Sequence, residues 1–122
     1  MAKLEIYYNS ACPVCDAGIE AERTRLARQG VDAAWKDIAT DNALVCEIGA
    51  ELDTVRHSLH VRDEAGTVFV GADAVARLMQ ETRGQRWLGQ LMMWAPLRPV
   101  MRWTYDRFAD RLYAWNRKKA RW

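Results

Sequence analysis

The sequence predicts a single α/β domain with the element order β-α-β-α-β-β-α, a four-stranded mixed sheet and a helical extension at its C-terminal end. Two observations lead to this prediction. Apolar residues alternate with a period of two in several short segments, and segments with a helical period separate the first three of these short segments from one another. A chain of 122 residues, 50% hydrophobic and 28% charged, has room for one compact domain with a core. We assign residues 1–84 to this domain and residues 85–122 to an extension packed on it.

The first strand and helix follow from the start of the chain. Leu4, Ile6 and Tyr8 alternate with more polar neighbours, as in a strand. After turn-like residues 9–11, apolar positions fall at helical spacing until Gln29-Gly30 ends the run. Alternation in residues 31–36 predicts a second strand, which a right-handed crossover places parallel to the first.

A short helix-plus-loop segment and a hairpin are expected next. The former carries the apolar residues Leu44, Val45, Ile48 and Leu52. Segments 59–62 and 67–70 flank a four-residue loop that ends in Gly66, which is typical of a β-hairpin. Asp73 is expected to cap a helix that closes near Gly84, with Val75, Leu78 and Met79 on its core face. This order of elements, with helices on both faces of the sheet, is the thioredoxin-like one.

The extension is predicted to contain two helices, because Pro96 and Pro99 divide it. The first covers residues 87–94 and the second ends near Lys119. One stripe of the second helix is expected to pack on the domain: Met101, Tyr105, Phe108, Leu112 and Trp115. Trp103 lies about 160–200° from the centre of that stripe and should be exposed.

The charge is unevenly spread along the chain. Residues 1–81 hold 8 Lys and Arg against 14 Asp and Glu, whereas residues 82–122 hold 10 against 2. The basic aromatic helix therefore has the composition of a surface for a peripheral membrane contact or for an acidic protein partner. Alternatively, its positive charges balance the negative charge of residues 1–81, within the fold or in a dimer. No recognised nucleic-acid motif is present, so we expect no nucleic-acid partner.

The cysteines indicate redox or metal chemistry. We expect a cytoplasmic protein, because the chain has no apolar leader and no run of membrane-spanning length. Three cysteines in a reducing compartment do not form a disulfide framework, so the close pair Cys12 and Cys15 needs another explanation. Cys46 stands apart and is expected to be a small buried apolar residue.

The pair belongs to the segment Cys12-Pro13-Val14-Cys15 at a strand-to-helix junction. Free N–H groups and the positive end of the helix dipole favour a thiolate at the first cysteine, which makes Cys12 the expected nucleophile. Cys15, one turn further and expected to lie deeper, is the resolving thiol that attacks a mixed disulfide at Cys12. Pro13 fits the first helical turn and preorganises it.

The segment Tyr8-Asn9-Ser10-Ala11-Cys12-Pro13-Val14-Cys15 resembles the signature of the DCC family of thiol-disulfide oxidoreductases, a thioredoxin-like group whose motif reads Asp-Gly-x-Cys-x-x-Cys. Further blocks similar to the family's extend over nearly the whole chain: Leu59-His60-Val61, Gly66, Gly71-Ala72-Asp73-Ala74, Arg86-Trp87-Leu88, Tyr105 with Arg107, and Asn116-Arg117. The resemblance implies disulfide exchange with a protein or a low-molecular-weight thiol or disulfide, with no cofactor and no bound metal.

Two departures bear on the dithiol. Asn9-Ser10 replaces the family's Asp-Gly, and Asn9 cannot ionise to accept a proton from Cys15 or to raise its pKa. Thioredoxins also carry a cis-proline before the hairpin, where this chain has residues 55–58. Substrate contacts are therefore expected to differ there, with His57 or Ser58 near Cys12.

Two other functions stay open. A zinc site at Cys12 and Cys15 would need two more ligands, and His57 and His60 would point to opposite faces of a strand. A non-catalytic thioredoxin-like binding module could keep the dithiol as a relic. Asn9 is the main support for that alternative.

Overall fold

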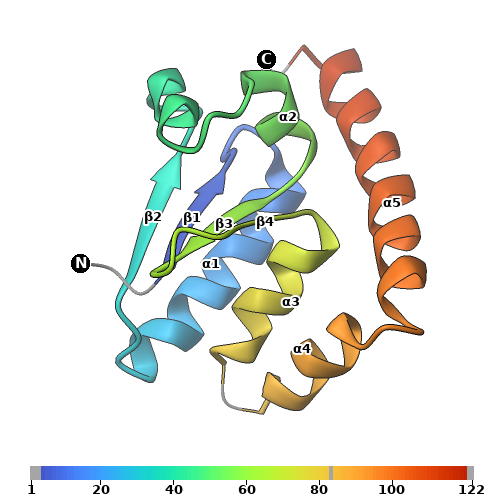
Figure 1. The fold of residues 1–122 in the computed structure, drawn as a ribbon. Coiled ribbons are helices and arrows are strands. Elements are labelled where there is room, and N and C mark those ends of the chain that lie inside the picture. Colours follow the sequence, from blue (N-terminus) through green and yellow to red (C-terminus); the bar gives the residue numbers. More distant parts are fainter. Residues whose placement is uncertain (1–3, 83, 121–122) are drawn as a thin grey trace.

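The computed structural model describes residues 4–82 and 84–120, and its helices and strands follow one another in the predicted order (Figure 1). The elements are β1 (Leu4–Tyr8), α1 (Pro13–Arg28), β2 (Ala33–Asp37), the 3-10 helix η1 (Asn42–Ile48), α2 (Leu52–His57), β3 (His60–Asp63), β4 (Val68–Val70), α3 (Ala72–Gln80), α4 (Arg86–Met93) and α5 (Arg98–Lys118). The segment predicted as one helix before the hairpin is thus two helices, η1 and α2.

The four strands form a mixed sheet in the order β2-β1-β3-β4. β1 is parallel to β2, with Ile6 opposite Trp35, and antiparallel to β3, with Ile6 opposite Val61. β3 and β4 form the predicted hairpin, whose loop is closed by Asp63 and by Gly66 at φ +85°. These pairings confirm the α/β fold and its thioredoxin-like topology.

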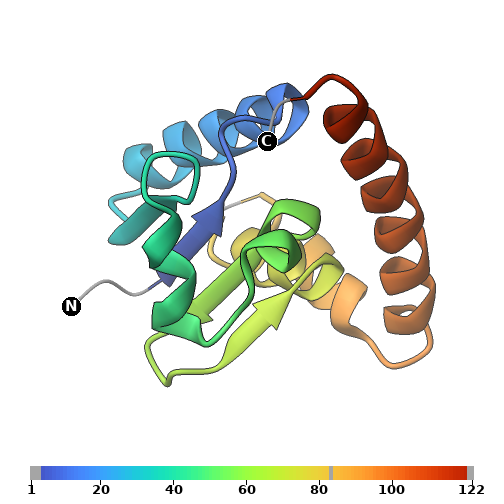
Figure 2. The ribbon, with the colours of Figure 1, turned by 90° about the horizontal axis from the view of Figure 1, so that it is seen from above.

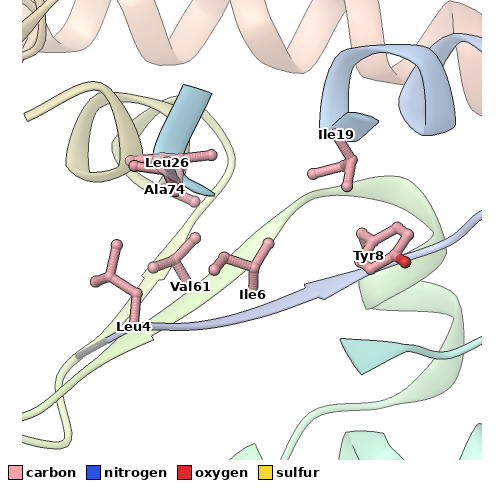
Figure 3. Close-up of a cluster of buried hydrophobic side chains, with 8 residues drawn as sticks. Leu4, Ile6, Tyr8, Ile19, Leu26, Val61 and Ala74 are labelled. Carbon is pink, nitrogen blue, oxygen red and sulfur yellow. The ribbon is translucent and has the colours of Figure 1, made fainter. Parts of the chain in front are cut away.

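The alternation in β1 places its side chains on both faces of the sheet. Leu4, Ile6 and Tyr8 point toward α1 and α3, and Figure 3 shows them with the helix residues that they meet. Tyr7 is buried on the opposite face, in a smaller cluster with residues of η1 and α2. Helices therefore cover both faces of the sheet, as predicted (Figure 2). The larger cluster consists of Leu4, Ile6, Tyr8, Ile19, Leu26, Val61, Ala74 and Leu78.

The start of α3 differs from the prediction. Gly71, at φ +66°, holds the N-cap position, and Asp73 makes no cap hydrogen bond. The Asp73 carboxylate instead binds Arg98 and Arg102 of α5, at 3.0 and 2.5 Å. The core face of α3 is also smaller than expected: alanines and Leu78 are buried, whereas Val75 and Met79 are half-buried. The predicted Asp73 cap is therefore wrong, and its charge links α3 to α5.

The predicted stripe of α5 is confirmed in part, because Met101, Tyr105 and Leu112 are half-buried. Ala109 and Asn116 are the buried residues of α5, whereas Phe108 and Trp115 of the stripe are exposed. Trp103 is 62% exposed, which confirms the prediction for that residue.

Candidate functional site

The pair Cys12 and Cys15 lies where β1 passes into α1. Two hydrogen bonds fix the loop between β1 and α1. The Cys12 N–H donates to the Asn9 carbonyl at 3.3 Å, and the Ser10 N–H donates to Asp37 Oδ1 at 3.1 Å. Cys12 is the N-cap residue in an extended conformation and Pro13 opens the helix. The Cys12 sulfur therefore lies at the free N–H groups of a 16-residue helix.

The two sulfurs have different electrostatic surroundings. The Cys15 N–H donates to Cys12 Sγ at 3.4 Å, as a helix N-terminus does for a thiolate. Burial raises the pKa of the Cys15 thiol to about 12, and a hydrogen bond from this thiol to Cys12 adds to the rise. Cys15 therefore keeps its proton at neutral pH and donates it in a hydrogen bond to Cys12.

The exposure of the pair is the reverse of the prediction. Cys12 is 0% exposed, whereas Cys15 is only partly buried. In Figures 1 and 2 the C-terminal half of α5 lies close to the start of α1, so the extension covers this end of the domain. Cys46, expected to be buried, is exposed on η1. Its prediction is wrong because η1 presents Val45 to the core instead.

Asn9 is buried beside the dithiol and is 4% exposed. Its Oδ1 accepts a hydrogen bond from the Ala11 N–H at 3.0 Å, which shapes the loop before Cys12. Its Nδ2 has no hydrogen-bond partner among the residues that the structure describes. A buried amide donor without a partner costs free energy, so this atom marks a place where a ligand acceptor would be favourable.

His57 and Ser58 form a short hydrogen-bonded chain with α5. His57 Nδ1 lies 2.7 Å from Ser58 Oγ, and His57 Nε2 lies 2.7 Å from Asp110 Oδ1. Within the described residues no peptide bond is cis, and Ser58 is extended. The residues predicted in place of the cis-proline thus lie on the wall of the same cavity as Cys15.

Tyr105 is a site residue that the sequence assigned only to packing. Its hydroxyl oxygen accepts a hydrogen bond from the Leu59 N–H at 3.0 Å, and burial raises the pKa of the phenol to about 12. It lines the cavity opposite Cys15. The sequence signal was its place in the blocks that resemble the family, and nothing in the helical period distinguished it from its neighbours.

A cavity of about 380 Å³ adjoins the dithiol. Its walls are α1, α3, α5 and the segment between α2 and β3, and most of the lining is apolar. Cys15 and Asn9 are among the lining residues, whereas Cys12 is not. The lining includes Asn9, Cys15, Gly18, Ser58, Leu59 and Tyr105.

The described residues contain no group of three or more His, Cys, Asp or Glu side chains placed to hold a metal ion. His60 is buried, its Nδ1 donates to the Ser58 carbonyl oxygen at 2.9 Å, and burial lowers its pKa. His57 is engaged by Asp110. The histidines weighed for zinc therefore have other partners.

Comparison with known proteins gives one family. A search of curated proteins and a search of solved structures found no match. In the part of the chain that the structure describes, no helix is both long and apolar enough to cross a membrane. The family model for DCC1-like thiol-disulfide oxidoreductases matches residues 6–118, which include the dithiol, the sheet and both C-terminal helices. The chain therefore belongs to the DCC1-like thiol-disulfide oxidoreductase family.

Proposed function

We propose that this protein exchanges disulfides at Cys12 and Cys15, with Cys12 as the attacking thiolate and Cys15 as the resolving thiol. One observation carries the proposal: at the start of α1, Cys12 Sγ accepts the Cys15 N–H at 3.4 Å, while the pKa of Cys15 is raised to about 12. The helix N-terminus supplies this hydrogen bond to the Cys12 sulfur, which suits it to attack, while Cys15 holds its proton until it is needed as the resolving thiol.

The roles of Cys12 as attacking thiolate and Cys15 as resolving thiol define the reaction. The Cys12 thiolate attacks one sulfur of a substrate disulfide, and the other sulfur leaves as a thiolate that takes up a proton. Cys15 then loses its proton and attacks Cys12 Sγ, which forms the Cys12–Cys15 disulfide and releases the second substrate thiol. Two electrons pass from the protein dithiol to the substrate disulfide. Cys12 is buried, so the side chains that cover its sulfur have to move before substrate reaches it.

A trapping experiment tests these roles. In a Cys46→Ser background, which removes the exposed thiol, the reduced protein is mixed with glutathione disulfide and analysed by mass mapping. We expect a glutathione adduct on Cys12 in Cys15→Ser, an internal disulfide without adduct when both cysteines are present, and little adduct in Cys12→Ser. An adduct mainly on Cys15 would reverse the roles. Stoichiometric zinc with no accessible dithiol, after purification under metal-clean conditions, would favour the metal site instead.

We also propose that the outer faces of α4 and α5 bind an anionic lipid surface. Trp87, Trp94 and Trp103 are 64%, 58% and 62% exposed. The Arg107 guanidinium lies 5.7 Å from the centre of the Trp103 ring. Exposed tryptophans among cations are typical of surfaces that rest at the membrane interface.

Co-sedimentation with liposomes tests the lipid contact. We expect binding to anionic vesicles, loss in about 0.5 M salt and weaker binding of Trp103→Ala. Val68→Ala, which removes an exposed apolar side chain from β4, is the matched control and should bind like the parent. Absence of binding to anionic vesicles would remove the lipid contact and leave an acidic protein as the candidate partner.

A further inference from the structure

The cavity beside Cys15 has the size and lining of a small-molecule site. Such sites are mostly apolar clefts of about 300–1,000 Å³ with a few convergent polar groups. Here the volume is about 380 Å³, and the lining includes the polar residues Cys15 and Asn9. Asn9 Nδ2, buried and without a partner among the described residues, is a donor that a carbonyl oxygen could satisfy.

The charged side chains on the cavity wall already have partners. Arg25 binds Glu22 at 2.6 Å, and Arg56 binds Asp53 at 3.2 Å. His57 is held by Asp110. A ligand carboxylate or ammonium group would lose its hydration without meeting an available opposite charge. The lining therefore favours an uncharged ligand.

The main-chain groups of Ser58 and Leu59, in the non-helical part of the wall, already have hydrogen-bond partners. The Ser58 N–H donates to Thr54 at 3.0 Å and its carbonyl faces His60 Nδ1 at 2.9 Å. The Leu59 N–H donates to the Tyr105 hydroxyl at 3.0 Å, and the Leu59 carbonyl accepts from Gly71 at 2.8 Å. Extended protein substrates gain affinity from main-chain hydrogen bonds, and all four groups here are used.

Gly18 keeps the cavity open on the side of α1. It lies inside the helix, where glycine costs about 1 kcal/mol relative to alanine. No described atom beyond its own helix backbone and neighbours lies within 4 Å of the position of a Cβ at Gly18, so packing does not require the glycine. A side chain there would extend into the cavity.

We infer that this cavity binds the substrate of the dithiol, and that the substrate is an uncharged low-molecular-weight disulfide with an apolar body and a carbonyl oxygen. This inference rests on the proposed function. The bound disulfide lies against Cys15 and, once the side chains that cover the Cys12 sulfur move, meets the Cys12 thiolate. The protein dithiol is oxidised to the Cys12–Cys15 disulfide and the ligand disulfide is reduced to two thiols, with one proton coming from Cys15 and one from solvent.

The probes are lipoamide and lipoate, which share a cyclic disulfide and an apolar chain but differ in an uncharged amide against a carboxylate. Binding is measured by calorimetry on the Cys12→Ser, Cys15→Ser protein, so that no chemistry takes place. We expect lipoamide to bind at least about tenfold more tightly than lipoate, because the wall offers no free cation. Adding Gly18→Leu should weaken lipoamide binding at least about tenfold. Ala17→Leu, which adds the same side chain outside the lining, should leave it unchanged.

Thermal unfolding of both leucine variants verifies that they are folded. Equal lipoamide affinity in the parent, Gly18→Leu and Ala17→Leu proteins, or no lipoamide binding to the parent, would overturn the cavity assignment. A second arm follows oxidation of Cys12 and Cys15 by lipoamide in one turnover of the reduced protein. Oxidation that is insensitive to Gly18→Leu would overturn the cavity assignment while the proposed function stands. Binding without any oxidation would contradict the proposed function and with it the assignment of a substrate.

Discussion

Two helical glycines form a matched pair that tests how the extension is attached to the domain. Gly18 lies in α1 and Gly89 in α4, and replacing either with alanine gains about 1 kcal/mol of helix propensity. At Gly18 a Cβ meets no described atom within 4 Å. At Gly89 it would lie 2.6 Å from the Ala76 carbonyl oxygen and 2.9 Å from the Gln80 nitrogen of α3. These are main-chain atoms, which cannot turn aside.

The magnitude follows from the difference between the two sites. Gly18→Ala should raise the free energy of unfolding by about 1 kcal/mol. The free energy of unfolding of Gly89→Ala should be about 1–3 kcal/mol lower than that of Gly18→Ala, because the added methyl group overpacks the α3–α4 contact. Urea unfolding at 25 °C, followed by far-UV circular dichroism, should separate the midpoints of the two variants by on the order of 1 M. Equal stabilisation by both substitutions would refute the close packing of α4 on α3.

Four further expectations concern the dithiol and its surroundings. Because the folded pKa of Cys15 is raised to about 12, its contribution to stability is present below the ordinary thiol pKa of about 8.5 and is lost as the pH rises toward 12. The free energy of unfolding should therefore decrease between pH 7 and pH 10 by roughly 1–2 kcal/mol less in Cys15→Ser than in the parent, as measured by urea unfolding. An equal decrease in both proteins would contradict the raised pKa. Asn9→Asp should move the pH profile of thiol reactivity upward by about 1 unit, because a carboxylate disfavours a second negative charge; superimposable iodoacetamide profiles would show that position 9 is electrostatically irrelevant. Tyr105→Phe should lower the free energy of unfolding by about 1–3 kcal/mol, because the buried Leu59 N–H loses its acceptor; no change in the unfolding midpoint would argue against that bond. In mass-mapped labelling at neutral pH, iodoacetamide should modify Cys12 faster than Cys15, and the opposite order would exclude Cys12 as the nucleophile.

The fold could be predicted because its signals are local. The alternation of Leu4, Ile6 and Tyr8 marks a strand with one buried face, and the glycine that ends the hairpin loop fixes the turn. The placement of Cys12 and Pro13 at the start of a helix follows from the same local reasoning. Most element boundaries shifted by one or two residues, and α3 ends at Gln80 instead of near Gly84, because local patterns do not determine exact boundaries.

The remainder of the site depends on contacts between distant segments. The burial of Cys12 and the partial exposure of Cys15 depend on tertiary packing that local patterns do not describe. Asp73 pairs with two arginines of α5, and the helical period of α5 does not encode this contact. Tyr105 became a site residue only through its bond to Leu59. Cavities are properties of such long-range packing and leave no periodic signal in the sequence.

Redox titration of the Cys46→Ser protein in glutathione buffers tests the central claim most directly. Samples equilibrated at a series of ratios of reduced to oxidised glutathione are acid-quenched, alkylated and mapped by mass spectrometry. We predict that Cys12 and Cys15 pass together from dithiol to internal disulfide in a single two-electron transition. If the two thiols remain reduced at every ratio, or form only glutathione adducts without an internal disulfide, the dithiol is not a redox couple and the non-catalytic binding module takes its place.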